Sequence, residues 1–235
     1  MSQFVEIKAG TLTRAAVFPD KPRRSRSPKA KPTSFWMEKV NIRHAFEKLM
    51  WLIASNFQLT DWMVSLDYDD AHLPRNRDDA VAQCKKFIRS LRASRKPFGR
   101  ILMYVYVTEG QHGDHRLHHH IIMNRFRGET EILRKIWKNG GVDWVPIGKL
   151  GYEGIARYLT KEPRQHGRLY VGDNIWAASR NLKKPVVVIT QVDDSFKPDL
   201  PTNAFDVTER IDKNPFGEFY YCDYKIPFSA VEKQH

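Results

Sequence analysis

The sequence of 235 residues is poor in cysteine and has no long apolar run. Its two cysteines, Cys84 and Cys222, form neither a CxxC zinc knuckle nor a disulfide framework, which suits a reducing compartment. No stretch approaches the ~18 apolar residues of a membrane span, and the N-terminus lacks an apolar signal core. The HExxH and GxxxxGK[ST] patterns are also absent, which argues against a zinc protease and an ATPase module. We therefore predict a cytoplasmic protein that does not associate with membranes.

Acidic residues are outnumbered, and the net charge is +12. Residues 1–34 carry 8 basic and 2 acidic side chains, whereas residues 191–235 carry 5 basic and 9 acidic ones. The segment 20–34 combines proline, serine and basic residues, so it reads as a linker or as an arm for a phosphate backbone. A basic body favours a polyanionic partner, most simply nucleic acid, over a basic protein without such a partner.

Apolar periodicity predicts an α+β fold with a central antiparallel sheet of ferredoxin-like character and helices packed on one face. The predicted helices are 37–56, 78–94, 129–139 and 152–162. The predicted strands are 62–69, 101–107, 117–123, 142–147, 167–172, 186–191 and 217–226, with an edge strand or hairpin within 1–19. We divide the chain into an N-terminal segment (1–34), a main domain (35–192), and an acidic connection with a C-terminal strand that packs on the same domain (193–235).

Three consecutive histidines stand inside a predicted strand, in the stretch ILMYVYVTEGQHGDHRLHHHIIMN (101–124). Side chains alternate along a strand, so His118 and His120 point to one side of the sheet and His119 to the other. Two imidazoles two residues apart can hold one metal ion, and Glu109 could add a hard oxygen ligand. The alternative is a histidine cluster that is only hydrogen-bonded or solvated.

The helix within GYEGIARYLTKEPR (151–164) carries two tyrosines with different surroundings. At about 100° per residue, Tyr152 lies on the apolar stripe, so we interpret it as a core residue. Tyr158 lies about 120° away and shares its side with Gly154 and Lys161, where a phosphate group has room to approach. The basic residues beside Tyr158 favour an anionic substrate.

These stretches resemble the HUH endonucleases, and more closely the rolling-circle replication initiators of small phages and plasmids. The likeness rests on the strand LHHHIIM, on the later helix IARYLTK, and on WMVSLDYD, which is similar to the first motif of those proteins. The three motifs occur in the expected order and cover roughly residues 60–165. The resemblance implies that residues 35–192 form an HUH nuclease domain.

The resemblance also assigns a metal site. His118 and His120 would be the histidines of the HUH motif, and His119 takes a place that is normally bulky and hydrophobic. Glu109 would be the third ligand, and His112 or His115 could take that role instead. The implied cofactor is a divalent metal, Mn²⁺ or Mg²⁺, although this ligand set does not exclude Zn²⁺.

The resemblance further implies that Tyr158 is the nucleophile and Lys161 a helper on the next helical turn. Some initiators carry a second tyrosine one turn earlier. Gly154 occupies that position here, so we expect one active tyrosine, with Tyr152 as the reserve candidate. Further DNA-binding residues are predicted at four basic positions: Arg157, Arg180, Lys183 and Lys184.

The implied function is nicking of single-stranded DNA at an origin, which leaves a 5′-phosphotyrosine link and a free 3′-hydroxyl and allows the strand to be rejoined. Expected partners are single-stranded DNA or an origin hairpin, and a host replication helicase or polymerase. A relaxase or transposase would use the same chemistry. A non-catalytic nucleic-acid-binding module is a further alternative, whereas a structural zinc site is disfavoured because no thiolate joins the histidines.

Overall fold

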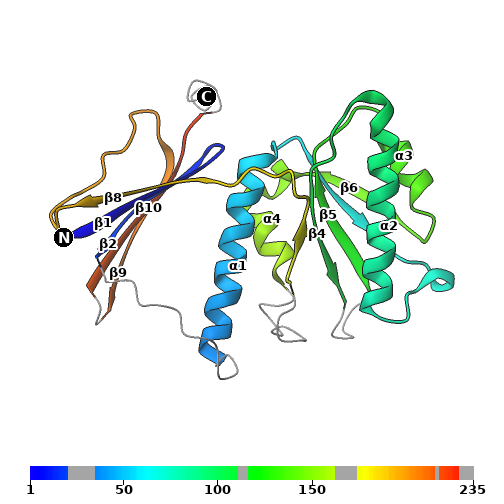
Figure 1. Cartoon of the computed structure of the whole chain (residues 1–235), viewed down its shortest axis with the longest axis horizontal. Helices are drawn as coiled ribbons and strands as arrows, with labels where there is room; N and C mark the ends of the chain where they lie inside the picture. The colour runs from blue at the N-terminus through cyan, green and yellow to red at the C-terminus, as the bar shows by residue number, and fades with distance from the viewer. Residues whose placement is uncertain (21–34, 111–115, 162–173, 215–216, 228–235) are drawn as a thin grey trace. The chain divides into compact units, whose positions relative to one another are not determined.

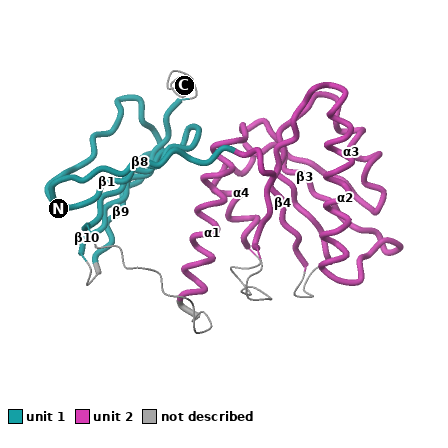
Figure 2. Tube along the Cα trace, in the orientation of Figure 1, with its two compact units in different colours: residues 1–33, 183–235 teal, residues 34–182 magenta. Residues whose placement is uncertain are grey.

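The computed structural model describes residues 1–20, 35–110, 116–161, 174–214 and 217–227. The chain divides into two compact units, which Figure 2 colours separately. Unit 1 comprises residues 1–33 and 183–235, and unit 2 comprises residues 34–182. Each unit contains a five-stranded antiparallel sheet, so the α+β class predicted from the sequence is confirmed. The predicted basic arm and the strand predicted at 167–172 fall outside the described residues.

Unit 2 has the strand order β6-β3-β5-β4-β7. Its strands are β3 (Trp62–Leu66), β4 (Tyr104–Glu109), β5 (His118–Met123), β6 (Val142–Pro146) and β7 (Ala177–Ala178). Its α-helices are α1 (Phe35–Asn56), α2 (Arg77–Arg95), α3 (Thr130–Ile136) and α4 (Gly151–Leu159). Three short 3₁₀ turns complete the described part of the unit: η1 (Asp70–His72), η2 (Lys96–Phe98) and η3 (Ile147–Lys149).

Helices cover both faces of this sheet (Figure 1). The main apolar cluster joins residues of α2 and α3, such as Cys84 and Leu133, to every second residue of the strands, such as Val64 and Ile121. α1 and α4 pack together and lie against the opposite face. The prediction of helices on one face only was therefore wrong. Central strands that are apolar on both faces, as β5 is at Ile121 and Ile122, need a cover on each side.

Unit 1 has the strand order β8-β1-β2-β10-β9. The strands are β1 (Ser2–Ala9), β2 (Leu12–Pro19), β8 (Val186–Val192), β9 (Phe205–Asn214) and β10 (Gly217–Lys225). β1 and β2 form the hairpin that the alternating N-terminal pattern predicted. Gly10 lies at the turn with a φ of 55°, a conformation that glycine adopts without strain.

The sequence analysis placed residues 193–235 on the main domain and treated 193–215 as a connection. β10 instead pairs with β2 and β9, inside the sheet of unit 1. β9 was missed because its residues between Phe205 and Lys213 are almost all exposed, as is common at the edge of a sheet. Such a strand lacks the buried alternation from which strands are recognised.

No helix in the described part of the chain has the length and apolar content that a membrane crossing requires.

Candidate active site

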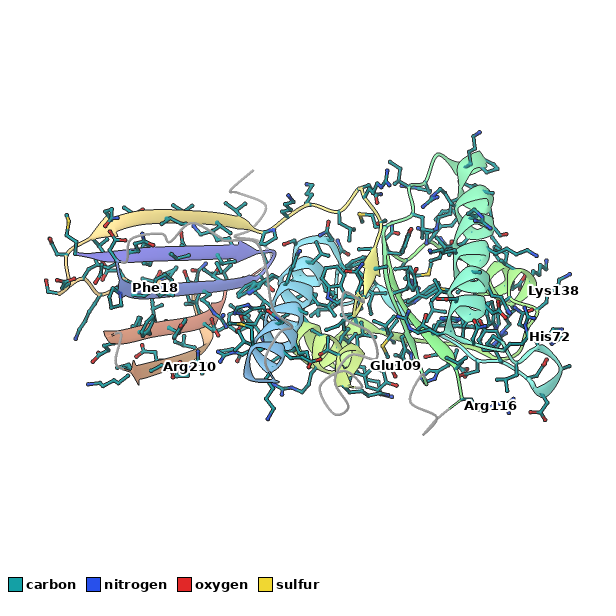
Figure 3. The ribbon with its side chains drawn as sticks, turned by 60° about the horizontal axis from the view of Figure 1, so that its bottom comes forward. Phe18, His72, Glu109, Arg116, Lys138 and Arg210 are labelled. Carbon is teal, nitrogen blue, oxygen red and sulfur yellow. The ribbon has the colours of Figure 1, made fainter. Side chains whose placement is uncertain are left out.

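Strand register brings the predicted acidic and histidine residues onto one face of the unit 2 sheet. Glu109 of β4 stands directly opposite His118 of β5, and Ser65 of β3 stands opposite His120. Residues that pair across antiparallel strands point to the same face. The four side chains therefore lie on the face covered by α1 and α4, and Figure 3 shows Glu109 beside the yellow-green helix α4.

Glu109, His118 and His120 form a cluster that can hold a metal ion, since one ligand atom from each lies within 4.8 Å of the others. Oε2 of Glu109 lies 3.3 Å from Nε2 of His118 and 3.7 Å from Nε2 of His120. Glu109 is 3% exposed and His120 is 4% exposed. The carboxylate and both imidazole nitrogens thus converge in a place that is largely shielded from water.

Both histidine rings are fixed through their other nitrogen. Nδ1 of His118 lies 2.8 Å from the Arg116 carbonyl oxygen, to which it can only donate. Nδ1 of His120 lies 2.9 Å from Oγ of Ser65. A hydrogen bond at one ring nitrogen orients the other toward a ligand, as is usual for metal-binding histidines. Sequence reasoning missed Ser65, although strand alternation around the buried residues Val64 and Leu66 places it on the histidine face.

The chemistry of the donor set fits a divalent cation. Two imidazoles and a carboxylate make a mixed nitrogen and oxygen set that Mn²⁺, Mg²⁺ or Zn²⁺ can use. Neither carboxylate oxygen of Glu109 accepts a hydrogen bond of good geometry among the described residues, although both are buried. Lys161 partly compensates this charge, with Nζ 3.0 Å from Oε2. A buried carboxylate that remains short of hydrogen bonds is suited to a cation.

Burial and charge set different protonation tendencies within the cluster. Burial lowers the pKa of His120 to about 4, and the nearby His118 and Lys161 act in the same direction against the attraction of Glu109. Burial also disfavours the charged form of His118, but the Glu109 and Arg116 contacts outweigh it and raise the pKa. For Glu109, burial is outweighed by His118, His120 and Lys161, and the pKa falls. A neutral His120 beside an ionised Glu109 is the state that a metal requires.

Tyr158 of α4 reaches this cluster. Its hydroxyl lies 3.2 Å from Nε2 of His120, and the two rings are 4.9 Å apart between centroids. Nζ of Lys161 lies 4.1 Å from the centroid of the Tyr158 ring. The structure therefore brings together all five residues predicted for metal binding and catalysis: Glu109, His118, His120, Tyr158 and Lys161.

Tyr152 lies elsewhere. It is buried, and its hydroxyl donates to the Phe57 carbonyl at 2.8 Å. Burial raises the pKa of this phenol to about 12. These contacts agree with the interpretation of Tyr152 as a core residue and leave its hydroxyl engaged away from the histidines.

His119 faces the opposite side of the sheet, as strand alternation predicted. Its Nε2 lies 2.7 Å from the Tyr68 hydroxyl and its Nδ1 lies 2.9 Å from Oγ1 of Thr108. The side chain is fully buried, and burial lowers its pKa to about 3. His119 is thus a neutral core residue with both ring nitrogens hydrogen-bonded.

The predicted DNA-binding residues do not gather at the cluster. Arg157 pairs with Glu153 at 2.6 Å on the exposed side of α4. Arg180 lines a pocket near the start of β4, whereas Glu109 ends that strand. Lys183 and Lys184 belong to unit 1. The alternative ligands His112 and His115 lie outside the described residues.

Comparison with known proteins finds a family match over residues 61–163, to a family model described as a replication-associated protein of the ORF2 type. No curated protein and no solved structure matches the chain. The matched stretch contains the whole Glu109, His118 and His120 cluster as well as Tyr158. The chain therefore carries a domain of the replication-associated protein family, in agreement with the resemblance to rolling-circle initiators.

Proposed function

We propose that this protein is a replication initiator endonuclease that nicks single-stranded DNA through covalent attack by Tyr158. The observation that carries the proposal is the position of the Tyr158 hydroxyl, 3.2 Å from a histidine of the metal-type cluster. Those two residues come from elements 38 positions apart in the sequence. A core tyrosine has no need of such a position, whereas a nucleophile must lie beside the groups that neutralise its target phosphate.

In the proposed reaction, the Tyr158 oxygen forms a bond to phosphorus and the bond from phosphorus to the 3′ oxygen breaks. The electron pair stays on the 3′ oxygen, which takes up a proton and becomes a free hydroxyl. The phenol loses one proton, so the protons balance. The protein then carries the 5′-phosphate on tyrosine, and attack by a 3′-hydroxyl reverses the step and rejoins the strand.

Glu109, His118 and His120 would hold the divalent cation, with Mn²⁺ or Mg²⁺ as the proposed metals. When bound, such an ion neutralises charge on the scissile phosphate and orients it. Ser65 and the Arg116 carbonyl keep the two imidazoles oriented. Lys161 contacts both the Glu109 carboxylate and the Tyr158 ring, so we assign it the role of holding positive charge beside the phosphate.

Single-stranded DNA is the proposed substrate because a phosphate that reaches this buried cluster cannot remain within a regular duplex. Arg157, Arg180, Lys183 and Lys184 are proposed to contact the strand outside the cleavage site. A free 3′-hydroxyl can prime synthesis, which gives the replication family its use for the reaction. A host helicase or polymerase would act on the nicked product.

The test uses a pool of single-stranded oligonucleotides that covers the replicon, labelled at the 3′ end, with Mn²⁺ and with EDTA. We expect a protein–DNA adduct on a denaturing gel that carries the 3′ label, because the 5′-phosphate stays on the protein. The same pool labelled at the 5′ end should yield shorter fragments that a polymerase can extend.

Tyr158→Phe should abolish the adduct, and Tyr152→Phe is the matched control that should retain it. An adduct that survives in Tyr158→Phe would contradict the assignment of the nucleophile. Binding without any adduct or shortened fragment across the whole pool would contradict the nuclease proposal and favour a non-catalytic binding module.

A further inference from the structure

A second feature of unit 2 lies away from the cluster, at the start of β4. The C-terminal half of α2, the turn η2 and the segment after β7 surround an open pocket of about 940 Å³. Tyr104, the first residue of β4, lines this pocket, whereas Glu109 ends the strand. Five residues of extended chain span about 17 Å, and residues five apart point to opposite faces. The pocket is therefore separate from the catalytic cluster, and Figure 1 shows both ends of β4.

The lining of the pocket is strongly basic and contains no carboxylate. Its five cationic residues are Arg89, Arg92, Lys96, Arg100 and Arg180. All five are exposed, and none has an ion-pair partner within the part of the chain that the structure describes. Five unpaired cations around one concavity repel one another, and an anionic ligand would relieve that repulsion.

Arg95 shows what a structural arginine looks like on the same helix. It is 1% exposed, and its guanidinium donates to both carboxylate oxygens of Glu129 and to the side chain of Asn124. These bonds fix the end of α2 to the segment after β5. The pocket arginines thus stand on a rigid support while their own charges stay uncompensated.

An aromatic ring completes the pocket. Tyr104 is half-buried and lies next to Arg92, whose guanidinium carbon is 6.0 Å from the ring centroid. Asn181 also lines the pocket, and its side-chain amide donates to the Leu102 carbonyl. Proteins bind single-stranded nucleic acid with this combination, in which basic residues follow the phosphates and an aromatic side chain stacks on a base.

We propose that this pocket binds a segment of single-stranded DNA outside the nicked position. The proposal relies on the DNA substrate of the proposed function but not on the cleavage step. Duplex DNA fits less well, because its bases are stacked inside the helix and cannot reach Tyr104. A strand long enough to contact both sites should bind more tightly than one that covers only one of them.

The test measures binding of fluorescent oligodeoxythymidine of 10 and 30 nucleotides over a range of salt concentrations. Arg92→Gln combined with Arg180→Gln should weaken binding of the 30-mer about tenfold and lower the slope of log K against log[salt] by about 1.4, or 0.7 for each lost phosphate contact. The control, Lys85→Gln combined with Lys86→Gln, removes two exposed charges from the same helix outside the pocket. It should change the affinity less than about twofold.

Tyr104→Leu separates stacking from charge. We expect about fivefold weaker binding of the 30-mer with an unchanged salt slope. Circular dichroism and thermal unfolding establish that each variant is folded. Equal losses in the pocket and control variants would overturn the proposal, and so would an equal loss for a 30-base-pair duplex. Because the readout is binding, these outcomes stand apart from the presence or absence of a covalent adduct.

Discussion

The two faces of the unit 2 sheet treat the same amino acid in opposite ways. On the α2 and α3 face, His119 is fully buried, neutral and hydrogen-bonded by Tyr68 and Thr108. On the α1 and α4 face, His118 and His120 turn ring nitrogens toward the poorly satisfied carboxylate of Glu109. The difference lies in the partners, since hydroxyl groups complete the first histidine while a carboxylate leaves a place for a cation. One face supports stability, and the other is suited to chemistry.

The largest effect should come from the chemical face. In His118→Ala or His120→Ala we expect strand cleavage to fall at least a hundredfold, since a group that supports charge neutralisation at the phosphate is lost. Calorimetric titration with Mn²⁺ should show loss of binding in the same variants. Unchanged Mn²⁺ affinity in both would break the proposed division between the faces.

Arg95→Met tests the support of the packed face. It leaves the buried carboxylate of Glu129 without its bidentate partner, and breaking a buried pair in this way costs about 3–5 kcal/mol of unfolding free energy. Urea denaturation measures the loss. Lys86→Met, an exposed change on the same helix, should stay within about 0.5 kcal/mol of the unaltered protein.

His119→Ala should lower the free energy of unfolding by about 2–4 kcal/mol, because it leaves a cavity and strips the buried Tyr68 and Thr108 hydroxyls of their partner. Mn²⁺ affinity in the folded protein should stay within about threefold. The comparison fails if His119→Ala removes metal binding while His118→Ala preserves it.

The pH dependence of stability gives a smaller effect. The pKa of His119 is about 3 in the folded protein and 6.5 ordinarily, so between these values the unfolded chain binds the extra proton. The contribution of His119 to stability is complete above pH 6.5 and is lost as the pH falls, by about 1.4 kcal/mol per pH unit at most. Urea denaturation of the metal-free protein from pH 7 to pH 5 should give a flatter profile for His119→Gln. Parallel profiles would show that His119 is not held neutral.

The local sequence determined much of the chemical face. Strand alternation separates His119 from His118 and His120 whatever the rest of the chain does, since the period of a strand is fixed by backbone geometry. Helical spacing likewise separates Tyr158 from the apolar stripe of Tyr152. These periodicities, with the motif resemblance, were enough to predict all five residues that converge on the cluster.

Tertiary structure decided what depends on contacts between distant segments. The register of β4 against β5 places Glu109 opposite His118, and the docking of α4 brings Tyr158 to His120. The pairing of β10 with β2 joins residues about 200 positions apart, and no local pattern encodes it. Side-chain periodicity reports which face a residue occupies, but the partner across that face is set by packing of the whole unit.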